Sequence, residues 1–230
     1  MTRQYPRLNE KLIYFAQLPL TCLVLAFVPT NTGKWAALLL LIWAFTFRKI
    51  SMPELRFFGI FCVFFTFMNK ASLDQGIFVF TYPDIWGMPA YELTMWGFYA
   101  LHTYRMIPAS PLPRPDYRLW LLVIAFSASF ATLKDPTLLL MVTGTLLAVG
   151  LYWHHDRYDL AYVAYMITVG AAIEYTGVLS GQWHYPGDPI GGVPFWFVTL
   201  WGGVGFFIRR WAGPLILEHC QIMLPTQSPK

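Results

Sequence analysis

The segment DLAYVAYMITVGAAIEYTGVLSG, residues 159–181, decides the fold class of this chain. It is apolar along nearly its whole length, and it is long enough for a helix to cross the roughly 30 Å hydrocarbon core of a bilayer. After Asp159 at its first position, one carboxylate, that of Glu174, interrupts it. An ionisable side chain inside a membrane span is costly and usually faces a bundle interior or a cavity. The segment therefore predicts a transmembrane helix that carries a buried acid.

The rest of the chain has a similar composition. Apolar residues make up 57% of the 230 residues and charged residues only 12%, about half the charged share of a soluble domain. The net charge of +4 does not indicate nucleic-acid binding, because the basic residues lie between apolar blocks, where they set topology. The polar N-terminal segment does not fit a cleavable signal peptide. We expect an all-α, multi-pass protein of the bacterial inner membrane.

Apolar blocks in the sequence give eight candidate spans. The second and third blocks are short and could form a shallow hairpin, which leaves six full spans as the alternative. With the N-terminus in the cytoplasm, thirteen of the 16 Lys and Arg residues fall on the cytoplasmic side, as the positive-inside rule requires. Both termini are therefore predicted to be cytoplasmic. The predicted spans are Leu12–Val28, Trp35–Phe47, Phe57–Met68, Met88–Met106, Leu119–Leu133, Thr137–Trp153, Tyr158–Leu179 and Val193–Ile208.

Matches at a constant offset indicate an internal repeat. We expect two parallel four-helix repeats, residues 1–110 and 111–230, that together form one transmembrane domain. The same offset places Asn69 opposite Glu174. The matching pairs, each 105 residues apart, are Pro89 and Pro194, Trp96 and Trp201, Gly97 and Gly202, and Arg105 and Arg210.

Each predicted repeat has a loop rich in Tyr, Trp, Pro and Gly near its outer face, and an acid lies beside each loop. Glu174 precedes the second loop, and Glu92 follows the first loop in the first turn of a helix. We expect both acids to face one pocket beneath the loops, with Glu174 as a general acid and Glu92 as its partner or base. The structural alternatives are that Glu174 hydrogen-bonds one helix to another and that Glu92 caps its own helix.

Aromatic residues, 18% of the chain, crowd around the two acids. A pocket walled by aromatic faces favours a positive charge and suits a flat, apolar, unsaturated ligand. Neither the cysteines nor the histidines indicate a metal site, and no nucleotide motif is present, so we expect no metal and no cofactor. The candidate substrate-binding residues are Asn69, Tyr82, Trp86, Tyr91, Trp96, Trp183, Tyr185, Trp196 and Trp201, and the candidate proton relays are His184, Asp84 and Asp188.

Two patches of sequence resemble known membrane enzymes. The pattern Glu174-x-x-Gly177-x-x-x-Gly181, followed by Tyr185, Gly192-Val193-Pro194 and Trp201, resembles the signature of integral-membrane carotenoid hydratases. The segment Gly87–Glu92 is similar to the acid-bearing motif of membrane lycopene cyclases, with Tyr91 where that motif has a second acid. The resemblance implies a repeated helical bundle whose carboxylates protonate a double bond or an epoxide without a metal.

The predicted function is therefore acid/base chemistry, without redox change, on an isoprenoid such as a terpene or carotenoid. Protonation would be followed by cyclisation or hydration, the activity of a cyclase (an isomerase or lyase) or a hydratase. The expected partners are the isoprenoid substrate and membrane lipids, and not nucleic acid. Two alternatives stay open. In a proton-coupled or small-solute transporter the same acids would bind cargo, and in a non-catalytic assembly subunit they would join helices.

Overall fold

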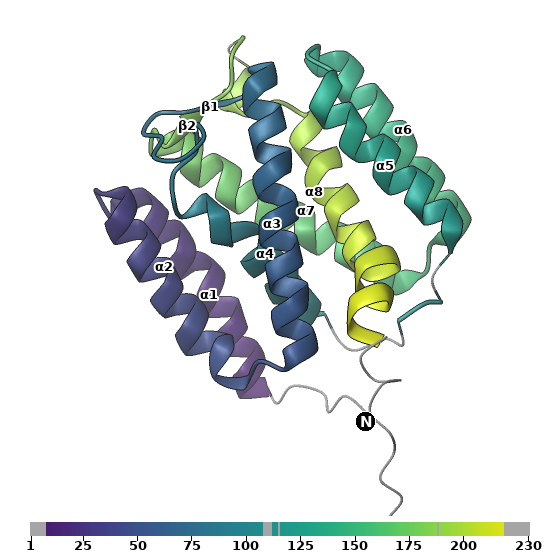
Figure 1. The fold of residues 1–230 in the computed structure, drawn as a ribbon, viewed down its shortest axis with the longest axis horizontal. Helices are drawn as coiled ribbons and strands as arrows, with labels where there is room; N and C mark the ends of the chain where they lie inside the picture. Colours follow the sequence, from purple (N-terminus) through teal and green to yellow (C-terminus); the bar gives the residue numbers. More distant parts are fainter. Residues whose placement is uncertain (1–7, 108–111, 115, 188, 219–230) are drawn as a thin grey trace, which may run out of the picture.

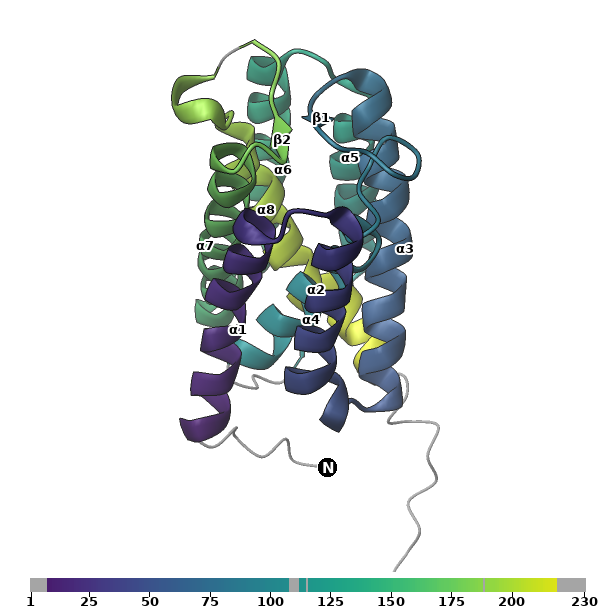
Figure 2. The same cartoon turned by 90° about the vertical axis from the view of Figure 1, so that its left-hand side faces the viewer.

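A computed structural model describes residues 8–107, 112–114, 116–187 and 189–218. Within these residues the chain forms a bundle of α-helices and one pair of very short strands (Figure 1). Figure 2 shows most of the helices running along one axis, with the strand pair near one end of the bundle. The helices are α1 (Leu8–Phe27), α2 (Asn31–Phe45), α3 (Met52–Gln75), α4 (Glu92–Met106), α5 (Tyr117–Thr132), α6 (Pro136–His154), α7 (Arg157–Leu179) and α8 (Trp196–Phe207), and the strands are β1 (Val79–Phe80) and β2 (Trp183–His184).

Length and composition make this chain a multi-pass membrane protein. Four helices are long and apolar enough to cross a bilayer, namely Met52–Gln75, Pro136–His154, Arg157–Leu179 and Ile190–Leu217, and the last of these includes α8. Leu12–Phe27 and Tyr117–Thr132 are shorter apolar helices. The prediction of a helical, multi-pass membrane protein is confirmed, whereas the number of spans stays a prediction.

Local sequence signals fix where the helices begin. Ser51 caps α3 and forms a capping box with Glu54, and Asp156 does the same for α7 with Asp159. Such boxes satisfy backbone N–H groups that have no partner inside the helix. The helix α3 extends well beyond the predicted span Phe57–Met68. The prediction was too short because the two ends of the helix are polar and do not contribute to the apolar block.

The centre of the bundle is built from α3, α4, α7 and α8, with the pair α1–α2 on one side and the pair α5–α6 on the other (Figure 1). Glycines permit close packing there. A Cβ atom added at Gly97 of α4 would lie 2.5 Å from the Phe58 carbonyl oxygen of α3, and one at Gly205 of α8 would lie 2.5 Å from the Tyr162 carbonyl oxygen of α7. Small residues of this kind let membrane helices approach closely.

The strands β1 and β2 pair antiparallel and bring the two Tyr-Pro loops together at one end of the bundle. Phe80 lies opposite Trp183 and Val79 opposite His184. Below them the rings of Trp96 on α4 and Trp201 on α8 stack with their centroids 4.7 Å apart. Segments more than 100 residues apart in sequence therefore meet at the strand pair and at the stacked tryptophans. Both acids lie beside these contacts.

Charged side chains pair at the opposite end of the bundle, where α3 and α7 begin and α4 and α8 end. Arg105 donates from Nε and Nη2 to the two carboxylate oxygens of Glu54, at 3.0 and 2.9 Å. Arg210 donates from Nε to both oxygens of Asp159, at 2.8 and 2.9 Å, and Arg209 also bonds to Asp159. Bidentate contacts between arginine and a carboxylate fix the relative orientation of the two helices and also compensate the charges.

Candidate functional site

The carboxylate of Glu174 is buried, and both of its oxygens accept hydrogen bonds. Its Oε2 atom accepts from Trp183 Nε1 at 3.1 Å and from the Tyr185 hydroxyl at 2.6 Å, and its Oε1 atom accepts from Trp201 Nε1 at 3.0 Å. The donors come from β2, from the loop after β2 and from α8. Glu174 therefore joins α7 to three positions in the C-terminal part of the chain.

Two glycines on α7 create the space in which these donors reach Glu174. Gly170 and Gly177 lie four residues before and three after the acid, so all three share a helix face. A Cβ atom at Gly170 would lie 2.2 Å from the Trp201 ring, and one at Gly177 would lie 2.0 Å from the Trp183 ring. The sequence Gly-x-x-x-Glu-x-x-Gly thus positions two indole rings against one carboxylate.

Tyr185, which lies in the loop outside the spans, stays a donor under physiological conditions. Burial, together with the neighbouring charge of Glu174, raises the pKa of its hydroxyl well above the usual value. The hydroxyl hydrogen is therefore available for the bond to Glu174 wherever the protein is folded.

Glu92 also lies inside the bundle, at the first residue of α4. Its Oε2 atom accepts a long hydrogen bond, 3.4 Å, from Asn69 Nδ2 on α3. The N-cap residue of α4, Tyr91, forms no side-chain cap bond, and Glu92 lies in the first turn, where a carboxylate interacts favourably with the helix dipole. Among the described residues, neither Glu92 nor Glu174 forms an ion pair.

The two acids line one small cavity of about 50 Å³. A water molecule occupies roughly 30 Å³ of liquid, so this cavity has room for one or two waters. Pockets that hold drug-sized ligands are about 300–1,000 Å³. The predicted site residues that line it are Asn69, Glu92, Trp96, Glu174, Trp183, Tyr185, Trp196 and Trp201.

Three of the candidate aromatic residues lie elsewhere. The side chains of Tyr82 and Trp86 are 62% and 58% exposed in the loop before α4. Trp86 has a positive φ of 52°, and its ring centroid lies 6.3 Å from that of Phe67 on α3. Tyr91 is fully buried but does not line the cavity.

The candidate proton relays do not reach the acids either. His184 is exposed on β2. Asp84 accepts a hydrogen bond from the backbone N–H of Ala90 at 3.0 Å and so stabilises its own loop. Asp188 lies outside the described residues. No described residue from this set is placed to carry a proton to Glu92 or Glu174.

One polar residue of the cavity was missed from sequence. Tyr99 lines the cavity, and its hydroxyl is buried without a hydrogen-bond partner among the described residues. It lies seven residues after Glu92 and three after Trp96, so helical spacing places the three on one face. That spacing was a signal from which Tyr99 could have been predicted. The other lining residues that were missed are Phe78, Phe80, Ile173 and Leu200.

No protein-family model and no curated protein matches this sequence. Two solved structures match its fold. One is described as a mycobacterial Insig homologue, MvINS, from Mycobacterium vanbaalenii, with a TM-score of 0.63, 17% identity, and coverage of 80% of this chain and 99% of that one. The other is a cross-linked trimer of a cysteine variant of MvINS, with the same TM-score and coverage and 16% identity.

These matches correct the predicted family and the predicted function. The resemblance to carotenoid hydratases and lycopene cyclases is wrong, and so is the inferred isoprenoid cyclase, isomerase, lyase or hydratase activity. Of the residues that carried the resemblance, Tyr185 and Trp201 donate hydrogen bonds to Glu174. Over most of its length the chain has the fold of a bacterial Insig homologue, with an acid-lined cavity at its centre.

Proposed function

We propose that this chain is a non-catalytic membrane protein that acts by assembling with other membrane proteins. The observation that carries the proposal is the bonding of Glu174. Three donors from separate segments occupy its carboxylate, so it serves as a structural bond between helices. The adjoining cavity of about 50 Å³ is, by itself, smaller than the roughly 300–1,000 Å³ of pockets that enclose drug-sized ligands. The fold shared with an Insig homologue agrees with this assignment.

We also propose that all eight helices span the membrane as two parallel repeats, residues 1–110 and 111–230, with both termini in the cytoplasm of a bacterium. The support is that equivalent residues have equivalent partners. Glu54 and Asp159, which are 105 residues apart, each close a capping box. Each also binds an arginine, Arg105 or Arg210, at the same offset. Trp96 stacks on its equivalent, Trp201.

The helix α6 is the proposed contact surface for assembly. Only 17% of its apolar segment is buried, compared with 67% for Ile190–Leu217, so most of α6 faces outward. Met141 and Tyr152 on α6 are 64% and 82% exposed. The cross-linked MvINS trimer has this fold packed in several copies, and we propose that α6 packs against another copy or another membrane protein.

Two measurements on one strain pair test the proposed function. Lipid extracts from cells with and without the gene should show the same isoprenoids, with no isomer or water adduct that depends on the gene. The tagged chain, solubilised gently and run on a native gel, should migrate as a complex larger than one chain. Met141→Trp on α6 should break this complex. Leu23→Trp on α1, a similarly exposed position, should not.

Two results would overturn the proposal. A gene-dependent isoprenoid product would restore an enzyme, and migration as a single chain in gentle detergents would remove assembly. Solute flux in proteoliposomes without chemical change would instead favour the transporter alternative.

A further inference from the structure

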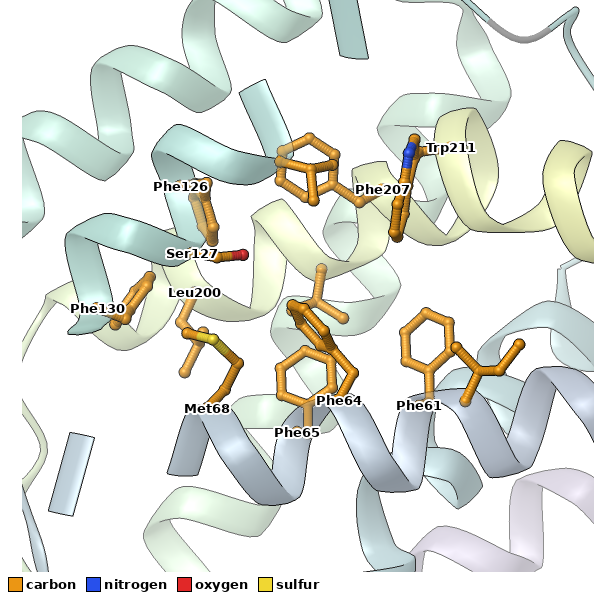
Figure 3. Close-up of a pocket in the computed structure, with 13 residues that line it drawn as sticks. Phe61, Phe64, Phe65, Met68, Phe126, Ser127, Phe130, Leu200, Phe207 and Trp211 are labelled. Carbon is orange, nitrogen blue, oxygen red and sulfur yellow. The ribbon is translucent and has the colours of Figure 1, made fainter. Parts of the chain in front are cut away.

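A second cavity lies between α3 and α5, with α8 behind it, and encloses about 70 Å³ (Figure 3). Figure 3 shows Phe61, Phe65 and Met68 of α3 facing Phe126 and Phe130 of α5 across this space. Ile60, which also lines it, is 49% exposed. The cavity, termed the groove below, therefore reaches the membrane-facing surface of the bundle.

A third cavity of about 40 Å³ adjoins both the groove and the cavity of the two acids. That cavity shares Phe65, Met68 and Phe130 with the groove, and it shares Asn69 and Trp96 with the acid-lined cavity. Leu200 of α8 lines all three. The three spaces therefore lie next to one another between the surface of α3 and α5 and Glu92, and this series of spaces is termed the path below.

A column of aromatic rings forms one wall of this path. The ring centroids of Phe61 and Phe65 are 5.9 Å apart, those of Phe65 and Trp96 are 4.0 Å apart, and those of Trp96 and Trp201 are 4.7 Å apart. Each pair is close to parallel, with interplanar angles of 21°, 8° and 23°. These rings give the path an apolar wall along which an alkyl chain can pack.

The inner end of the path has the chemistry of a site for a cationic head. Glu92 is buried, accepts one long hydrogen bond and has no ion pair among the described residues. The hydroxyl of Tyr99, also buried, has no partner there. An ammonium group supplies three N–H donors. It would satisfy both Glu92 and Tyr99 in the cavity that Trp96 and Trp201 also line.

We propose that this path binds a single-chain cationic amphiphile, a long-chain primary amine, that enters sideways from the bilayer. Its ammonium group contacts Glu92 and Tyr99. Its chain follows the aromatic column into the groove and continues into the lipid. A buried carboxylate without a counter-charge is unfavourable, and the amine supplies that charge. This inference goes beyond the proposed assembly function and does not depend on it.

Photocrosslinking of the full chain in nanodiscs of zwitterionic lipid tests this binding. The probes are hexadecylamine, hexadecanol and hexadecanoic acid, each with a diazirine at the same chain carbon, and mass spectrometry maps the labelled peptides. The amine should label peptides of α3 and α5 saturably, with at least tenfold tighter half-saturation than the alcohol or the acid. Glu92→Gln should weaken labelling by the amine at least tenfold.

Further variants keep the test decisive if Glu92→Gln does not fold. Ser127 points into the groove (Figure 3), and Ser127→Phe should fill it and abolish labelling there. Tyr99→Phe should weaken the amine severalfold. Asp74→Asn, at a surface ion pair, should change nothing. Equal labelling by amine and alcohol in wild type and in Glu92→Gln would overturn the head-group site. Labelling spread evenly over α1, α2 and α6, or unaffected by Ser127→Phe, would overturn the path.

Discussion

At the scale of single residues, substitution of Glu174 tests whether this side chain has a structural or a chemical role. A carboxylate can accept every hydrogen bond offered by Trp183, Tyr185 and Trp201, whereas a glutamine turns its NH₂ group toward one of these donors. The donor that loses its acceptor is buried, which costs about 1–3 kcal/mol. Glu174→Gln should therefore lower the free energy of unfolding by about that amount, measured in detergent by tryptophan fluorescence.

The matched control for Glu174→Gln is Asp74→Asn. Asp74 pairs with Lys70 on the surface of α3 and its side chain is 62% exposed, and exposed ion pairs contribute about 0–1 kcal/mol. This variant should unfold close to the wild-type midpoint. If Glu174→Gln is as stable as Asp74→Asn, the three hydrogen bonds do not hold the bundle and the structural role is wrong.

Asp156, between α6 and α7, gives the chain a pH-dependent contribution to stability. Burial opposes its ionisation, but the N–H groups of Asp159 and Tyr158 and the guanidinium of Arg209 outweigh burial and lower its pKa below the ordinary 3.8. Since the folded-state pKa is below the unfolded one, the stabilisation is fully present above pH 3.8 and is lost as the pH falls through the folded-state value.

Asp156→Asn removes this contribution at every pH. Wild type should therefore exceed the variant in unfolding midpoint by a constant, small margin above pH 3.8, and the margin should shrink below it. The effect is small because the Asp156 side chain is 43% exposed. Thermal unfolding of both proteins across this range gives the margin. A margin that stays constant into strong acid would contradict the assignment.

At the scale of elements, the packing of α7 depends on where its glycines lie. Gly177→Ala places a methyl group 2.0 Å from the ring of Trp183, and the rigid indole must move away from Glu174. Overpacking of this kind costs about 1–3 kcal/mol. Gly59→Ala on α3 meets nothing within 4 Å and should gain up to about 1 kcal/mol from helix propensity. The free energy of unfolding should therefore fall in Gly177→Ala and rise in Gly59→Ala. Unfolding curves followed by near-UV circular dichroism measure both changes.

The helices could be predicted from sequence, and the strand pair could not. Apolar blocks of about 15–20 residues give a strong signal for membrane helices, and the Pro and Gly residues of Tyr82–Met88 marked a loop. The strands β1 and β2 have two residues each, too few for an alternating pattern. Their pairing depends on contacts between residues about 100 positions apart.

The convergence of Glu92 and Glu174 could be predicted because each acid adjoins one of the two Tyr-Pro loops, which were expected to meet above one pocket. The role of Glu174 could not, because catalysis and structural bonding use the same residue types. A carboxylate near Trp and Tyr residues fits a proton donor and an acceptor of indole N–H groups equally well. Only the distances to Trp183, Tyr185 and Trp201 separate the two.

At the scale of the whole molecule, a fold can be kept with few residues in common. The chain and MvINS are 17% identical, yet 80% of this chain follows the MvINS backbone. Apolar side chains in a membrane bundle exchange freely, since lipid and protein interior are similarly apolar. Short motifs of Gly, Trp and Tyr are therefore a weak guide to family in such chains, whereas helix lengths and charge placement carry the architecture.

The last prediction concerns topology, and cysteine labelling tests it. In a chain without its three native cysteines, Trp86→Cys and Ile190→Cys should react with an impermeant maleimide added to intact cells, because both loops are predicted to be outside. These positions are 58% and 88% exposed. Arg48→Cys, between α2 and α3, should react only after the membrane is opened. If α2 and α3 instead form a shallow hairpin, the cysteine at position 48 does not reach the cytoplasm. Its labelling then does not depend on opening the membrane, and the chain has six spans. Because α3 is 24 residues long and its start binds Arg105 at the end of α4, we expect the full crossing.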